Sequence, residues 1–141
     1  MMPNWTSNKL EISGSKEEVA RFVEHVGQNM DFEKIIPPPA NMFRENLGEE
    51  ERRECKKKGI PNWYDWQSEN WGTKWNANQD KPVEVWETPD FMVATYEFDT
   101  AWATPEPVIR RIIKDWPELE VTGGWVDECY EGCGSFQQFW E

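Results

Sequence analysis

Tryptophans and polar residues alternate in the stretch "NWYDWQSENWGTKWN", residues 62–76, which holds four of the chain's ten tryptophans. Aromatic walls around a few directed polar groups are typical of small-ligand pockets and of protein-binding hot spots. The alternative is structural, because large rings can fill the core of a thin sheet, and it is the stronger interpretation for Trp66 and Trp71. The stretch supplies six candidate binding residues: Asn70, Trp71, Thr73, Lys74, Trp75 and Asn76.

A second aromatic and polar cluster occurs in "FDTAWATPEP", residues 98–107, at a predicted junction between a strand and a helix. Its candidate residues are Thr100 and Trp102. The N-terminus of a helix favours an anion, and a lysine can neutralise a phosphate. If the two clusters meet, Lys74 and this helix start could hold the phosphate of a nucleotide-like ligand between indole rings.

Catalytic chemistry finds little support in the residue inventory. The chain has one histidine and lacks a P-loop, a dinucleotide-binding glycine motif and a nucleophile elbow. Asp65 and Glu69 would share a helix face and, with Glu128, could hold a metal for hydrolysis, but solvated carboxylates are far more common. We therefore expect no enzyme, no catalytic or metal-binding residues and no cofactor.

The three cysteines, Cys55, Cys129 and Cys133, are odd in number and follow no framework of spacings. This pattern fits reduced thiols better than secreted disulfides. Neither a signal peptide nor an apolar run of about 20 residues is present, so we expect a cytoplasmic protein.

The formal net charge is −12 and the sequence pI is about 4.6. Such a field repels phosphate backbones and anionic lipid, so direct binding to nucleic acid or to a membrane is not expected. The charge suits a cationic partner or serves solubility alone. We expect one domain, residues 1–141, as a monomer or a small homo-oligomer.

Hydrophobic spacing predicts a strand over residues 8–13, followed by an amphipathic helix from a capping box at Ser15 to Gly27. The letters "FEKIIPPP", residues 32–39, predict a short extended segment that the prolines end. The next part of the chain divides into a charged, partly helical excursion at 41–59 and a tryptophan-rich insertion at 60–78.

The second half of the chain predicts a hairpin of strands over 82–87 and 91–99. Thr104 predicts the N-cap of a helix with Pro105 at its first position, which Pro117 ends. Two further strands are predicted in 119–128 and 134–140, and the pair Gly123–Gly124 indicates a bulge or a close backbone approach. The order strand, helix, strand, strand, helix, strand, strand favours an α+β fold, a ferredoxin-like sandwich with two helices on one face of an antiparallel sheet.

Four phrases make the chain resemble the YubB ferredoxin-like domain family: "MPNWTSNKLEISG", "WYDWQSENWGTKWN", "FDTAWATPEPVI" and "DECYEGCGSF". The resemblance spans nearly the whole chain except residues 41–59. It implies a small cytoplasmic protein of phages and plasmids with a ferredoxin-like shape and no iron–sulfur cluster. Asn4 and Trp5 lie in the first phrase and join the candidate binding surface through the resemblance. Thr6 departs from the family, where a cysteine is expected.

The residues and the resemblance favour an accessory protein that binds and modulates a host protein, such as a defence factor. The alternative from another class is a protein that binds or sequesters a nucleotide-like small molecule in an indole-lined pocket.

Overall fold

The computed structural model describes residues 4–128 and 132–140. The described elements, in chain order, are β1 (Trp5–Ser15), α1 (Lys16–Val26), a 3-10 turn (Phe32–Lys34), α2 (Glu49–Lys58), α3 (Trp63–Asn70), β2 (Glu84–Glu87), β3 (Phe91–Ala101), α4 (Glu106–Asp115), β4 (Glu120–Asp127), β5 (Cys133–Ser135) and a second 3-10 turn (Phe136–Phe139).

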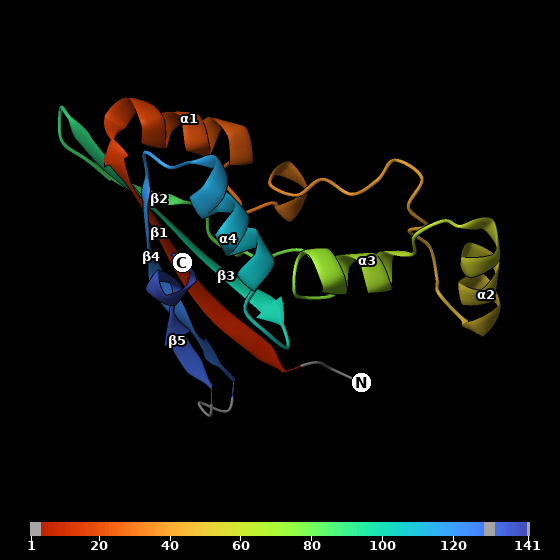
Figure 1. Ribbon diagram of the computed structural model, residues 1–141. Helices are drawn as coiled ribbons and strands as arrows, with labels where there is room; N and C mark the ends of the chain where they lie inside the picture. The colour runs from red at the N-terminus through yellow and green to blue at the C-terminus, as the bar shows by residue number, and fades with distance from the viewer. Residues whose placement is uncertain (1–3, 129–131, 141) are drawn as a thin grey trace.

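The strands form one sheet in the order β2-β3-β1-β4-β5, and every neighbouring pair is antiparallel. Helices α1 and α4 lie on one face of this sheet (Figure 1). Without β5, the strands and these two helices have the order and pairing of a split β-α-β repeat. The predicted ferredoxin-like α+β sandwich is therefore confirmed.

The core lies between the sheet and these two helices. Every second side chain over this part of β3 is buried: Met92, Ala94, Tyr96 and Phe98. The Tyr96 hydroxyl donates to the Gly27 carbonyl oxygen (2.8 Å), and burial raises the pKa of this phenol above its ordinary value of about 10. The neutral phenol therefore contributes stability that is fully present below pH ~10 and is lost as the pH rises further.

Some local signals act as the sequence predicts. The Ser15 hydroxyl accepts a hydrogen bond from the Glu18 N–H, as expected of the predicted cap. The structure adds a second cap at the start of α3, where the Asn62 side chain accepts a hydrogen bond from the Asp65 N–H. Three other predictions are wrong. The "FEKI" letters form a 3-10 turn capped by the Asp31 carboxylate, and the "FQQF" letters form a second 3-10 turn. Thr104 does not cap α4, because Pro105 stands at the cap and the Thr104 hydroxyl donates to Asn8 Oδ1.

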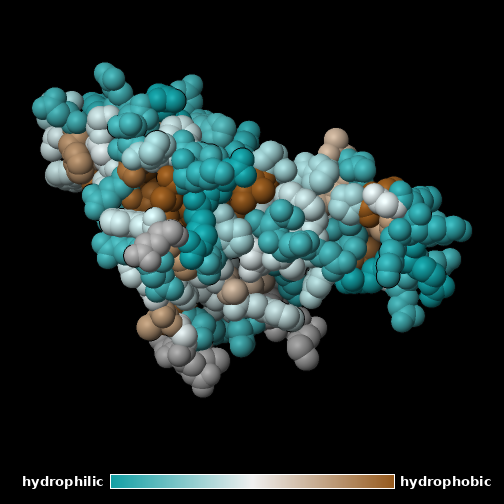
Figure 2. Space-filling model, in the orientation of Figure 1, coloured by the Kyte–Doolittle hydropathy of each residue, from teal (hydrophilic) through white to brown (hydrophobic). Residues whose placement is uncertain are grey.

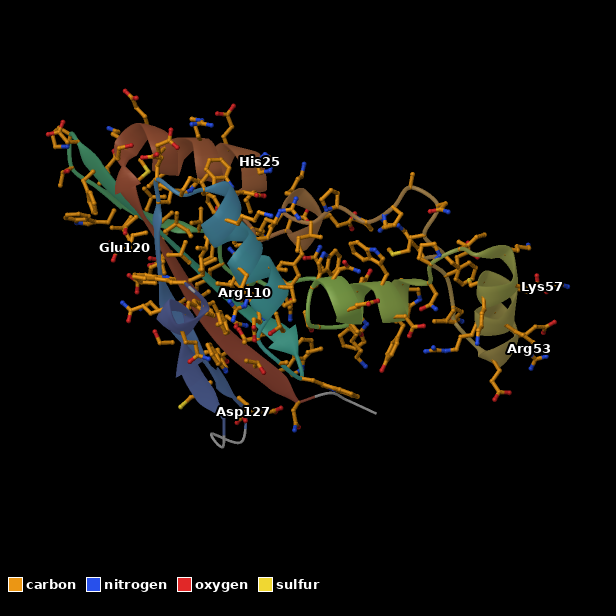
Figure 3. The ribbon with its side chains drawn as sticks, in the orientation of Figure 1. His25, Arg53, Lys57, Arg110, Glu120 and Asp127 are labelled. Carbon is orange, nitrogen blue, oxygen red and sulfur yellow. The ribbon has the colours of Figure 1, made fainter. Side chains whose placement is uncertain are left out.

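The charged excursion contains α2, which stands away from the sheet, as Figure 1 shows. Its glutamates begin the helix and its lysines end it, so the charges match the helix dipole. Arg53 and Lys57 point from α2 into solvent (Figure 3). The predicted exposed, partly helical character of residues 41–59 is confirmed.

The tryptophan-rich insertion covers the edge of β3 that β2 leaves open. Strand β2 pairs only with residues 92–95 of β3. Further along β3, Asn78 forms a bridge with Asp99, and the Thr73 hydroxyl donates to the Ala101 carbonyl oxygen (2.7 Å). An uncovered strand edge is a site for unwanted pairing, so the insertion protects this part of the sheet.

Gly123 allows β4 to approach β1 closely. Its φ angle is 108°, and a Cβ atom added there would lie 1.9 Å from the Lys9 carbonyl oxygen. The close backbone approach predicted for this glycine is confirmed.

We predict that Gly123→Ala destabilises the protein by about 3 kcal/mol, because left-handed backbone strain adds to the shift needed to relieve the clash. Gly59→Ala is the matched control, since Gly59 has φ 69° with nothing within 4 Å of its added Cβ. That control should lose about 1 kcal/mol. Urea unfolding measures both, and equal losses in the two variants would contradict the close approach.

Candidate functional site

Three separate segments bring an exposed group of indoles around one lysine. Trp5 comes from the start of β1, Lys74 and Trp75 from the insertion, and Trp102 from the turn after β3. We call these four side chains the indole cluster. The Trp5 and Trp75 rings have centroids 6.0 Å apart and planes tilted by 39°. Trp75 is 37% exposed and Trp102 57% exposed, so much of the cluster faces solvent.

Lys74 sits between two of these rings. Its Nζ atom lies 4.4 Å from the centroid of the Trp75 ring and 4.8 Å from that of the Trp102 ring. Both distances are within the range of a cation–π interaction. Among the described residues no carboxylate forms an ion pair with Lys74, although acidic residues outnumber basic ones almost two to one in the chain.

Pairing of β1 with β3 places the cluster at one end of the sheet. Trp5 lies opposite Ala101, at the last pair of the ladder. Ala101 also accepts the hydrogen bond from Thr73, so it lies between β1 and the insertion and is 1% exposed. Trp5 therefore lies beside the point at which the insertion is attached to β3.

Trp102 has an unusual backbone conformation. Its φ angle is 71°, and it is the one non-glycine residue with positive φ in the described part of the chain. The Ala103 N–H donates to the Ala101 carbonyl oxygen (2.9 Å), which makes a three-residue γ-turn centred on Trp102. A bulky residue in this region costs of order 1–3 kcal/mol and persists only where its surroundings hold it.

Hydrogen bonds from several elements hold this turn. The Trp102 N–H donates to the Asn4 carbonyl oxygen (2.8 Å), and the Thr100 hydroxyl donates to the Ala103 carbonyl oxygen (2.6 Å). Thr100 in turn accepts from Asn8 Nδ2 (3.0 Å), a buried amide that also accepts from the Thr104 hydroxyl. A network of hydrogen-bonded polar side chains, Asn8, Thr100 and Thr104, therefore holds the turn in place.

The remaining candidate residues make structural contacts. Trp71 is buried and its indole N–H donates to the Ile36 carbonyl oxygen (3.0 Å), which agrees with the core alternative. Asn70 Nδ2 donates to the Trp66 carbonyl oxygen. Asn76 ties the insertion to the 3-10 turn, because its Oδ1 accepts from the Phe32 N–H (2.9 Å) and its Nδ2 donates to Asp31. The Thr73 hydroxyl bonds to the Ala101 carbonyl oxygen and the Thr100 hydroxyl to the Ala103 carbonyl oxygen, on either side of Trp102.

A hollow of about 660 Å³ adjoins the cluster on the open face of the sheet. Ser7 and Asp99, the next residues on this face after Trp5 and Ala101, belong to its lining. The lining carries charges of both signs from these residues: Lys9, Asp80, Lys81, Glu97 and Asp99.

Two of the three carboxylates considered for metal-assisted chemistry, Asp65 and Glu128, have other partners. Asp65 accepts from Asn62 Nδ2 (2.9 Å) and from Arg52 (3.4 Å), and Glu128 accepts from the Trp5 N–H (3.0 Å). Over residues 4–128 and 132–140, no three histidine, cysteine or acidic side chains are placed to hold a metal ion. Of the three cysteines, Cys55 is buried and Cys133 is exposed, and Cys129 lies outside the described residues.

The importance of Asn8, Ala101 and Ala103 was not anticipated from the sequence. An asparagine at an inward-facing position of β1, between Thr6 and Leu10, is the one available signal, because a buried amide needs partners.

We predict that Trp102→Gly is more stable than Trp102→Ala by about 1 kcal/mol, since glycine has no Cβ to strain at positive φ. Both variants lose the same ring contacts, so their difference isolates the backbone term. Thermal or urea unfolding of the pair provides the measurement. An alanine variant as stable as the glycine variant would show that the turn is unstrained.

The described chain contains no helix long and apolar enough to cross a bilayer. Comparison with known proteins gives no match among the curated proteins and none among the solved structures. Residues 70–138, just under half of the chain, match the family model described as "Ferredoxin-like domain in Api92-like protein". The matched part runs from the end of α3 to the second 3-10 turn and includes Lys74, Trp75 and Trp102. The match and the strand order agree on a ferredoxin-like domain.

Proposed function

We propose that the protein is a non-enzymatic binding protein that attaches to a host protein through the indole cluster and modulates it. The conformation of Trp102 carries the proposal. Holding this residue at positive φ costs of order 1–3 kcal/mol, whereas one cation–π contact at an exposed site contributes about 0.5–1 kcal/mol. Trp102 is nevertheless 57% exposed, so much of its ring surface is available to a partner.

Exposed tryptophans held in place by a rigid scaffold have the properties of a binding hot spot. Tryptophan is enriched in hot spots because it supplies a large contact area at a small cost in side-chain entropy. The network under the turn holds Trp102 before any partner arrives, which reduces the ordering cost of association. The net charge of −12 favours a partner whose surface is basic.

The biological setting of this proposal comes from the resemblance to the YubB domain family. That resemblance supports a cytoplasmic accessory protein of a phage or plasmid, whose partner is a protein of the host cell, such as a defence factor.

Absence of an ion pair on Lys74 within the described residues favours a second candidate, a nucleotide-like ligand that stacks on an indole and places its phosphate on Lys74.

We predict that Trp75→Ala and Trp102→Ala each weaken capture of the partner from host lysate at least about tenfold, as expected for hot-spot residues. Trp140→Phe is the control, because Trp140 is also partly exposed but donates its indole N–H to the Val121 carbonyl oxygen away from the cluster. Quantitative mass spectrometry of eluates at several salt concentrations compares the variants.

Equal capture by all the variants would place the binding surface elsewhere. Quenching of tryptophan fluorescence by a nucleotide, lost in Lys74→Ala, would instead support the ligand candidate.

A further inference from the structure

Strand β2 forms an outer edge of the sheet, because no described strand lies beyond it. Its hairpin with β3 extends past α1 at the upper left of Figure 1, and Figure 2 shows apolar surface among hydrophilic residues in this region. All four residues of β2 are exposed. This edge lies toward the opposite end of β3 from the indole cluster, roughly 20–30 Å away along the strand.

Hydrogen bonds define which backbone groups of β2 face outward. The Thr88 N–H donates to the Phe91 carbonyl oxygen, so Thr88 belongs to the set of residues that bond to β3. Bonding alternates along an antiparallel pair, and therefore Val85 and Glu87 direct their N–H and C=O groups to the free edge. Val83 has the same parity, and its N–H donates outward to the Gln28 carbonyl oxygen (2.8 Å). The free edge thus begins after Val83.

An apolar patch accompanies these free backbone groups. Trp86 is 62% exposed, Val85 48% and Phe91 41%. Trp86 pairs with Val93, and Phe91 is two residues from Val93, so the side chains of Trp86, Val93 and Phe91 share the open face of the sheet. Val85 pairs with the buried Ala94, so its exposed side chain lies on the other face. Because most of the surface of Trp86 is not buried by its own chain, its ring is available to anchor a partner.

Charge selects the occupant of this edge. Glu84 and Glu87 lie at the ends of β2, and Glu87 forms an exposed ion pair with Lys16 (3.6 Å). A second copy would bring two more glutamates to the seam and another −12 of net charge. A strand with basic residues would instead gain from both glutamates.

We infer that the β2 edge binds an extended basic segment of another polypeptide as an added antiparallel strand. The segment bonds to the outward groups of Val85 and Glu87, places an apolar side chain on Trp86 and sets basic residues beside Glu84 and Glu87. This surface is separate from the indole cluster, so the inference goes beyond the proposed function.

The test uses the full chain labelled with ¹⁵N and two synthetic peptides, acetyl-Thr-Lys-Val-Thr-Lys-Val-Thr-amide and the same peptide with both lysines replaced by glutamate. We expect the amide signals of Val85 and Glu87 to shift most. The lysine peptide should bind at least about fivefold more tightly at about 20 mM salt, and the difference should shrink at about 500 mM.

Val85→Pro should abolish binding without unfolding the sheet, because it removes an N–H that makes no bond to β3. Trp86→Ala should weaken binding through loss of the anchor, even if Val85→Pro fails to fold. Trp102→Ala is the control and should bind the peptide as the unchanged protein does.

Equal binding of the two peptides, absence of binding to either, or shifts centred outside β2 would overturn the inference. Shifts at Val85 and Glu87 that depend on protein concentration without peptide would also overturn it, by identifying a second copy as the occupant.

Discussion

Antiparallel pairing of β1 with β3 is the constraint on which the rest of the structure depends. The ladder runs from Trp5 opposite Ala101 to Ser15 opposite Phe91. A shift of one residue would turn Leu10 and Ile12 from the core to solvent, so burial fixes the register strongly. The same register fixes Trp5 at the end of the ladder, beside the turn that carries Trp102. Core packing therefore determines where the candidate binding surface lies.

The tryptophan-rich insertion has two roles, which its residues divide between them. Trp71 attaches the insertion to the loop before the charged excursion, Thr73 attaches it to β3, and Asn76 attaches it to the first 3-10 turn. Lys74 and Trp75, placed between these anchors, turn outward to the indole cluster. Attachment on both sides of the two exposed residues limits their motion, and a preorganised surface binds with less loss of entropy.

Much of the fold could be predicted from periodicity alone. The hairpin of β2 and β3, the helix α4 and the cap at Ser15 are local signals, and the structure confirms each of them. Thr104 failed as a cap because its hydroxyl bonds to Asn8, which is 96 positions away in the chain. The "FQQF" letters failed as a strand because Phe136 and Phe139 pack against Trp125. The Phe139 ring is stacked nearly parallel to the indole plane, with the ring centroids 5.3 Å apart. Tertiary contacts decided both positions.

In the candidate site, too, local sequence predicts some features and tertiary contacts decide the others. Residue types indicated that the indoles of residues 62–76 could form either core or surface, and the structure assigns Trp71 to the core and Trp75 to the surface. The γ-turn at Trp102 could not be predicted, because its hydrogen bonds come from Asn4, Thr100 and the Ala101 carbonyl oxygen, which only the folded sheet brings together. The proposed binding role of the cluster depends on that turn.

Photo-crosslinking in living bacterial cells tests the proposed role most directly. A photoreactive amino acid at position 103, an exposed alanine beside Trp102, reports on contacts of the indole cluster, and one at Lys57 on the outward side of α2 serves as the reference (Figure 3). The account predicts a discrete protein adduct from position 103 that excess unlabelled protein suppresses and excess Trp102→Ala does not. The same adducts from both positions, or none from position 103, would contradict it.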